Sequence, residues 1–202
     1  TNFSNIMLKG SALRIFLKFN SSMRQAILFA FESTAACAVL PEPKFVIAHI
    51  MCPHPPFIFA SDGGLPPDNQ GDYLVEDVGV ARINKTAFIN QIKFTNKITI
   101  ETIDAILKKS KNPPIMIIHG DHSLNLYETN SLNSGKTMPD KTYLKARMRI
   151  LNAFLLPGVD ASNSPVYDSI TPVNNFRVVF NHYLGTKFEI LPDRNFYAPA
   201  DM

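Results

Sequence analysis

The feature that most constrains the fold is a long amphipathic stretch, residues 85–109, between two short apolar runs. Its apolar side chains recur every three or four residues, which predicts a helix: Phe88, Ile89, Ile92, Ile98, Ile103, Ile106 and Leu107. Asn84 is placed to cap this helix, and Pro113 ends it because proline restricts the residue before it. The flanking runs 44–50 and 115–120 are rich in branched residues and predict buried strands.

The remaining elements extend this alternation of strands and helices. We expect helices at 11–19, at 21–36 and from Pro172 to Gly185 with Thr171 as its cap, and strands at 149–158 and 187–191. Such an order predicts an α/β fold with a mixed, mostly parallel sheet flanked by helices. We expect a single domain over 1–202, with a helical lead-in at 10–40 and the α/β core at 44–197.

Composition excludes several classes of protein. Of the 202 residues, 46% are apolar and 18% are charged, which is typical of a folded chain. The net charge of +3 comes from scattered Lys and Arg, so we expect no nucleic-acid partner. Cys37 and Cys52 match neither a disulfide framework nor a zinc knot. The most apolar stretch, 23–40, contains charged residues and is too interrupted to span a bilayer.

The run 115–120 leads directly into residues that can bind metal. His119 lies inside the run, and Asp121 and His122 follow Gly120. Carboxylate and imidazole are the ligand types of zinc and manganese, so Asp121 and His122 are candidate metal ligands. The alternative is that they serve as caps or loop hydrogen-bonding groups. For His119 we expect core packing or a hydrogen bond that supports a ligand.

A second candidate lies in the long irregular stretch from 51 to about 83. Prolines on both sides of His54 stiffen its backbone and suit contact with an anion or a leaving-group oxygen. Packing of His54 against Phe57 is the alternative. For His49 the same core or supporting role as for His119 is expected.

Other polar residues favour structural roles. No GxSxG motif and no phosphate-binding glycine loop occurs, so the sequence offers half of a site. Asn174, Asn175 and Arg177 could contact an anion, but hydrogen bonds from their helix to neighbouring loops are the favoured interpretation. His182 also favours a structural role.

Five blocks of the sequence resemble one known family. They are FVIAHIMCPHPPFIF, FINQIKFTNKITIETIDAILKKS, PPIMIIHGDHS, RILNAFLLPG and YDSITPVNNFRVVFNHYLG. In their order along the chain and in their residues they resemble the carboxyl-terminal half of membrane-anchored sulfatase-like proteins. These belong to the alkaline phosphatase and sulfatase superfamily, with lipoteichoic acid synthase and phosphoethanolamine transferases. The resemblance covers residues from about 10 to 197.

The resemblance implies roles for three residues. Asp121 and His122 would ligate a catalytic divalent ion (Mn, Zn, Mg or Ca), and His54 would contact the phosphate or sulfate group of an ester substrate. Ser123 stands where the family usually has Gly. The nucleophile and the remaining acidic ligand would lie in a missing amino-terminal half.

Because the chain begins at Thr1 without a signal-peptide pattern, we expect it to belong to a longer protein. The resemblance places that protein in a cell membrane, through segments outside this chain, with the present domain extracytoplasmic. The function implied is a hydrolase or transferase of phosphate or sulfate esters, with envelope lipids or polymers as substrates. The 202 residues alone would be inactive. The rival hypothesis is a non-catalytic binding or structural module that kept the fold and lost the reaction.

Overall fold

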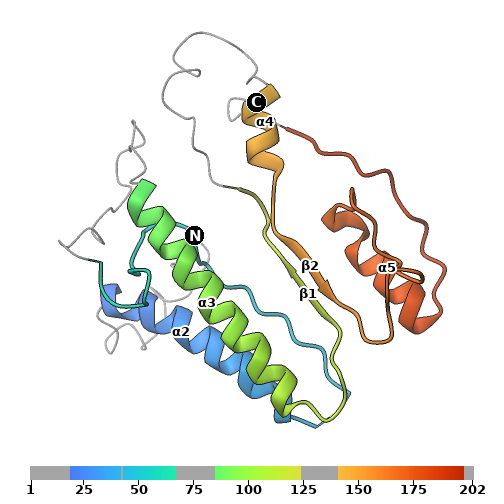
Figure 1. Cartoon of the computed structure of the whole chain (residues 1–202), viewed down its shortest axis with the longest axis horizontal. Helices are drawn as coiled ribbons and strands as arrows, with labels where there is room; N and C mark the ends of the chain where they lie inside the picture. Colours follow the sequence, from blue (N-terminus) through green and yellow to red (C-terminus); the bar gives the residue numbers. More distant parts are fainter. Residues whose placement is uncertain (1–18, 42, 67–84, 124–140, 198–202) are drawn as a thin grey trace, which may run out of the picture. The chain divides into compact units, whose positions relative to one another are not determined.

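The computed structural model describes residues 19–41, 43–66, 85–123 and 141–197, which belong to two compact units, Thr1–Lys111 and Asn112–Met202. Figure 1 shows the elements in chain order: α2 (Phe19–Ala36), the short 3₁₀ helix η2 (Cys37–Val39), α3 (Lys85–Lys109), β1 (Met116–His119), α4 (Lys141–Met148), β2 (Asn152–Leu155) and α5 (Pro172–Leu184).

The predicted fold class is wrong. The described residues are rich in helix, and their only sheet consists of β1 and β2. These strands pair antiparallel, with Met116 opposite Leu155 and His119 opposite Asn152. A parallel pair needs a crossover that returns the chain to the same end of the sheet, and β1 and β2 run in opposite directions instead. A mostly parallel sheet flanked by helices is therefore absent from the described part of the chain.

Two of the predicted strands do not form. Residues 44–50 are extended but pair with no strand among the described residues, and Phe45 and Ile47 are 70% and 77% exposed. An apolar run predicts burial, but a strand also needs a neighbour with which to exchange backbone hydrogen bonds. Residues 187–191 are likewise extended without strand pairing, because helix side chains bind their backbone groups.

The predicted helices correspond closely to the observed ones. α2 contains the predicted helix 21–36, and α3 spans the predicted 85–109. α5 begins at Pro172 and ends before Gly185, whose φ of +65° is the left-handed conformation that glycine favours at this position. Residues 11–18 of the first predicted helix and the cap Asn84 lie outside the described residues.

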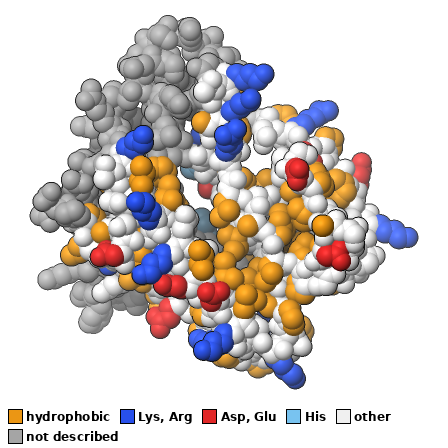
Figure 2. Space-filling model, in the orientation of Figure 1, with side chains coloured by type: hydrophobic (Ala, Val, Ile, Leu, Met, Phe, Trp, Pro, Cys, Tyr) orange, Lys and Arg blue, Asp and Glu red, His pale blue; other side chains and the backbone are white. Residues whose placement is uncertain are grey.

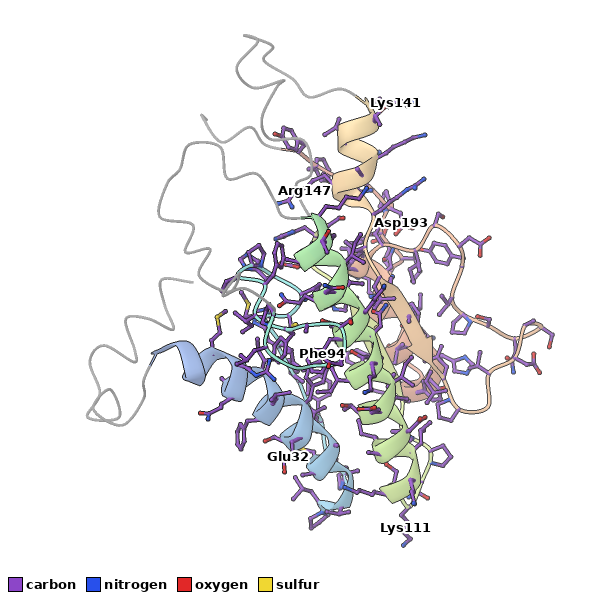
Figure 3. The ribbon with its side chains drawn as sticks, turned by 60° about the vertical axis from the view of Figure 1, so that its left-hand side comes forward. Glu32, Phe94, Lys111, Lys141, Arg147 and Asp193 are labelled. Carbon is purple, nitrogen blue, oxygen red and sulfur yellow. The ribbon has the colours of Figure 1, made fainter. Side chains whose placement is uncertain are left out.

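The core of the first unit lies between α2, α3 and the loop that follows residue 50. α2 packs on α3, and Ile27 and Phe31 of α2 meet Phe59 and Phe94. The rings of Phe59 and Phe94 stack with centroids 4.4 Å apart. Figure 3 shows Phe94 on α3 near the middle of this packing. The side chain of Phe59 therefore holds the loop against α2 and α3.

Arg24 ties the far end of this loop to α2. Its guanidinium lies 4.5 Å from the centroid of the Phe59 ring and donates hydrogen bonds to the carbonyl oxygens of Ile58, Gly63 and Gly64. Gly63 has a φ of +93°, and a Cβ atom there would lie 2.5 Å from the Phe94 ring. Only glycine can follow this path so close to the ring.

In the second unit, α5 is held by asparagine side chains. Asn175 and Asn152 of β2 exchange two hydrogen bonds through their amide groups, at 2.8 and 3.1 Å. Asn174 binds both the N–H and the C=O of Leu191, and Asn181 does the same to Phe188. The amides thus take the place of a partner strand for the extended segment. Asn174 thus makes the predicted hydrogen bonds to a neighbouring loop, whereas Asn175 bonds to a strand residue, Asn152.

Exposed apolar side chains occur in both units, and many are visible as orange areas in Figure 2. The most exposed of the described residues are Phe29, Val39, Phe45, Ile47, Leu65, Leu151, Leu184 and Phe196. Single exposed apolar residues are normal in folded proteins, so each one by itself indicates no binding function.

Candidate metal centre

Asp121 and His122 form a turn at the point where the chain leaves the sheet. β1 ends at His119, and the next residue, Gly120, donates its N–H to the Leu151 carbonyl at 3.0 Å. The hydrogen bonds between the two strands therefore fix the backbone up to residue 120. The side chains of the next two residues, Asp121 and His122, are exposed. The antiparallel pairing with β2 thus presents both predicted ligands at one end of the sheet.

The geometry of the two side chains suits a shared cation. Oδ1 of Asp121 accepts a hydrogen bond from the His122 N–H at 2.9 Å, and Oδ2 lies 3.5 Å from Nε2 of His122. Two ligand bonds of about 2.1 Å that meet at a tetrahedral angle place their donor atoms about 3.4 Å apart. One carboxylate oxygen therefore orients the side chain, and the other forms a donor pair with the imidazole.

Arg147, at the end of α4, holds the residue that follows this pair. Ser123 donates its N–H to the main-chain carbonyl of Arg147 at 3.1 Å, and its own carbonyl accepts a hydrogen bond from Nη1 of Arg147. The same Nη1 lies 2.9 Å from Nδ1 of His122. Figure 3 shows Arg147 at the opposite end of α4 from Lys141. The turn is thus anchored on both sides, at Gly120 and at Ser123.

The donor set in the described residues stops at two. No group of three or more His, Cys, Asp or Glu side chains suited to a metal occurs in the described parts of the chain. His119 is exposed, with Nδ1 3.3 Å from the carbonyl oxygen of Gly120, so the expectation that it packs in the core is wrong. Asp121 and His122 therefore supply two donors, fewer than the three or four protein ligands of a typical zinc site.

His54 lies in the first unit, on the irregular loop. Its side chain is exposed, whereas Phe57 is buried and packs on Phe88 with ring centroids 5.6 Å apart. Nδ1 of His54 lies 2.6 Å from the carbonyl oxygen of Pro55. Since a carbonyl oxygen only accepts, this contact is a hydrogen bond when the ring carries its hydrogen on Nδ1.

The loop that carries His54 is organised around Gln91 of α3. This amide is 1% exposed. Its oxygen accepts hydrogen bonds from the N–H groups of Ile58 and Phe59 at 2.7 and 3.2 Å, and its nitrogen lies 3.1–3.4 Å from three carbonyl oxygens, those of Pro53, His54 and Pro56. Gln91 was not predicted as a functional or organising residue, although a polar residue on the apolar face of helix 85–109 was a signal.

The two remaining histidines belong to no cluster of three or more metal-binding side chains among the described residues. His49 and His182 are both exposed. The ring of His182 lies edge-on to Tyr183, with centroids 4.8 Å apart. Arg177 donates to the carbonyl oxygen of Glu189 at 2.9 Å, which agrees with the structural interpretation of this residue.

Asp193 is the most perturbed carboxyl group in the described residues, and its role is to fasten α5. It accepts hydrogen bonds from the hydroxyls of Thr171 and Tyr167, both at 2.6 Å, and from the N–H of Thr171 at 2.7 Å. These bonds, those from Thr171 first, lower the pKa of Asp193 to about 2. Thr171 therefore stands at the cap position of α5 while its hydroxyl binds Asp193.

We predict that this carboxylate makes the protein less stable in acid. Because its pKa is lower in the folded chain than the unfolded value of about 3.9, Asp193 contributes stability above pH 4 that is lost as the pH falls toward about 2. Urea unfolding across this range should show a smaller loss for Asp193→Asn than for the wild type. Asp168→Asn, an exposed control, should behave like the wild type, and equal losses in all three proteins would contradict the assignment.

Comparison of the chain with models of protein families, with curated proteins and with solved structures finds no match. Among the described residues, no helix is both long enough and apolar enough to cross a bilayer. The case for a function therefore depends on the residues of the site.

Proposed function

We propose that the chain is the metal-ligand half of a sulfatase-like hydrolase or transferase acting on phosphate or sulfate esters. The observation that carries the proposal is the pairing of Asp121 Oδ2 with His122 Nε2 at 3.5 Å, on a turn anchored at both ends. The resemblance of the five sequence blocks supports the same function. In this proposal the longer protein is anchored in a membrane with the present chain outside the cytoplasm, and its substrates are lipids or polymers of the envelope.

Three residues of this chain, His54, Asp121 and His122, have a defined role in such a reaction. Asp121 and His122 would hold a divalent ion, which would supply a lowered pKa for a hydroxyl nucleophile and neutralise the anionic oxygens of the ester. The resemblance gives His54 the role of contacting the phosphate or sulfate group of the ester, and its Nδ1 lies 2.6 Å from the Pro55 carbonyl oxygen. The nucleophile and the remaining acidic ligand come from the part of the protein that precedes Thr1.

Metal uptake tests the proposal. With two donors the chain should bind zinc or manganese weakly, and Asp121→Asn or His122→Gln should lower the affinity by on the order of tenfold or more. Asp104→Asn, an exposed carboxylate on α3, is the matched control and should leave the affinity unchanged. Isothermal titration with zinc chloride measures all four proteins.

Two results would contradict this assignment. Zinc affinity that does not change in Asp121→Asn and His122→Gln would remove both residues from the site. No zinc binding by the longer protein would instead favour the non-catalytic binding or structural module.

A further inference from the structure

Arg147 occupies a position next to the proposed metal ligands that their own chemistry does not require. Nη1 of Arg147 lies 2.9 Å from Nδ1 of His122, and it also donates to the carbonyl oxygen of Ser123. The third side of this triangle is the distance from Nδ1 of His122 to the Ser123 oxygen, 3.0 Å. A guanidinium group, an imidazole nitrogen and a carbonyl oxygen therefore meet at one point.

The guanidinium favours one of the two possible assignments of hydrogens. A hydrogen on Nδ1 could be donated to the Ser123 carbonyl oxygen, but it would leave an Nη1 hydrogen facing an N–H group. Arginine stays protonated and has no acceptor atom, so the nitrogen that it contacts must carry a lone pair. Nη1 has two hydrogens, which serve Nδ1 of His122 and the oxygen of Ser123. The imidazole hydrogen then lies on Nε2, the atom that is 3.5 Å from Oδ2 of Asp121.

We propose that Arg147 is a positioning residue that keeps the hydrogen of the His122 ring on Nε2, and that a divalent cation and the Arg147–His122 hydrogen bond compete for this ring. The part that concerns the cation rests on the proposed function. The tautomer of the metal-free ring is inferred from the guanidinium contact, which competes with the Ser123 carbonyl oxygen for Nδ1.

Cation binding exchanges the two tautomers. A neutral imidazole that ligates an ion through Nε2 carries its hydrogen on Nδ1. The Ser123 oxygen at 3.0 Å then accepts that hydrogen, which is the supporting bond that metal-binding histidines usually make to a carbonyl or a carboxylate. Nη1 can no longer donate to Nδ1, so it must move off the ring while its bond to Ser123 can stay. Loading of the site would thus release one donor of Arg147 from the His122 ring.

Long-range proton–nitrogen correlation spectra of the whole 202-residue chain test this inference, since they distinguish the two tautomers directly. The His122 signals are assigned by their loss in His122→Gln. In the metal-free wild type we expect the shifts of a ring protonated on Nε2. In Arg147→Met the Nδ1-protonated form should become the major one, because the Ser123 oxygen then remains as the partner of Nδ1. Lys145→Met, which removes another cation of α4, should give the wild-type spectrum.

Either of two metal-free results would overturn the inference: a wild-type ring protonated on Nδ1, or an Arg147→Met spectrum identical to that of the wild type. If Arg147→Met does not fold, the wild-type spectrum decides the question. Addition of zinc chloride to the wild type should move the hydrogen to Nδ1 and shift the Nη1 signal of Arg147. An unchanged His122 spectrum at saturating zinc would overturn the proposed function and the competition, while the metal-free tautomer is judged by the first two results.

Discussion

Replacing Gln91 by Met should destabilise the first unit by about 2–4 kcal/mol. Methionine keeps the length of the side chain but removes the amide that is hydrogen-bonded to five backbone groups of the loop 53–59. The Phe59 residue that donates to it is 1% exposed, so its N–H would lose its partner in a place that water does not reach. A buried donor without a partner costs about 1–3 kcal/mol.

Hydrogen exchange and urea unfolding measure this effect. The amide hydrogens of Ile58 and Phe59 should exchange faster in Gln91→Met, and the unfolding midpoint should fall. Asn96→Met makes a comparable change at an exposed position of the same helix and should shift stability by no more than about 0.5 kcal/mol. Unaltered exchange at Ile58 and Phe59 would mean that Gln91 does not organise the loop.

The second large effect is expected for Asn174→Leu. Asn174 is fully buried, and its amide binds the N–H and C=O of Leu191 as well as the hydroxyl of Tyr167 and the carboxylate of Asp193. Leucine keeps the branched shape and supplies no polar atom. We expect a loss of about 2–4 kcal/mol, with the extended segment released from α5.

Measurements on the segment itself can separate this effect from a general loss of stability. The amide hydrogen of Leu191 should lose its protection in Asn174→Leu, while that of Phe188, which depends on Asn181, should lose less. Asn195→Leu, at an exposed position, is the control. If the main-chain N–H of Leu191 stays protected from exchange in Asn174→Leu, the side chain of Asn174 does not hold the segment 187–191.

The helices were predictable because their signals are local. The apolar spacing of 85–109 and the prolines that follow it define α3 within a few residues, and Pro172 and Gly185 bracket α5. α4 was missed, since Lys141–Met148 lacks a clear apolar stripe and contains three basic residues. Local patterns thus identify an element best where one face of it is apolar.

The sheet was predicted less well because strands depend on distant partners. The runs 115–120 and 149–158 do contain β1 and β2, but nothing in either run states that they pair antiparallel. Residues 44–50 have the composition of a strand and no strand partner among the described residues. The segment 187–191 finds its hydrogen bonds on Asn174 and Asn181 of a helix, which no strand pattern can indicate.

The residues of the candidate site were likewise predictable only where the signal is local in the sequence. Asp121 and His122 were identified because they are adjacent in the sequence and follow an apolar run, and the structure places their donor atoms 3.5 Å apart. Arg147 lies 25 residues from His122, so only the fold brings it to the turn. Gln91 is 37 residues from His54 and was hidden for the same reason.

Anomalous X-ray scattering from crystals of the chain soaked in zinc chloride locates a bound ion directly. If Asp121 and His122 hold a cation together, a zinc peak should lie within about 2.0–2.2 Å of both Nε2 of His122 and Oδ2 of Asp121. Zinc bound elsewhere in the crystal, with these two atoms turned away from each other, would contradict this prediction.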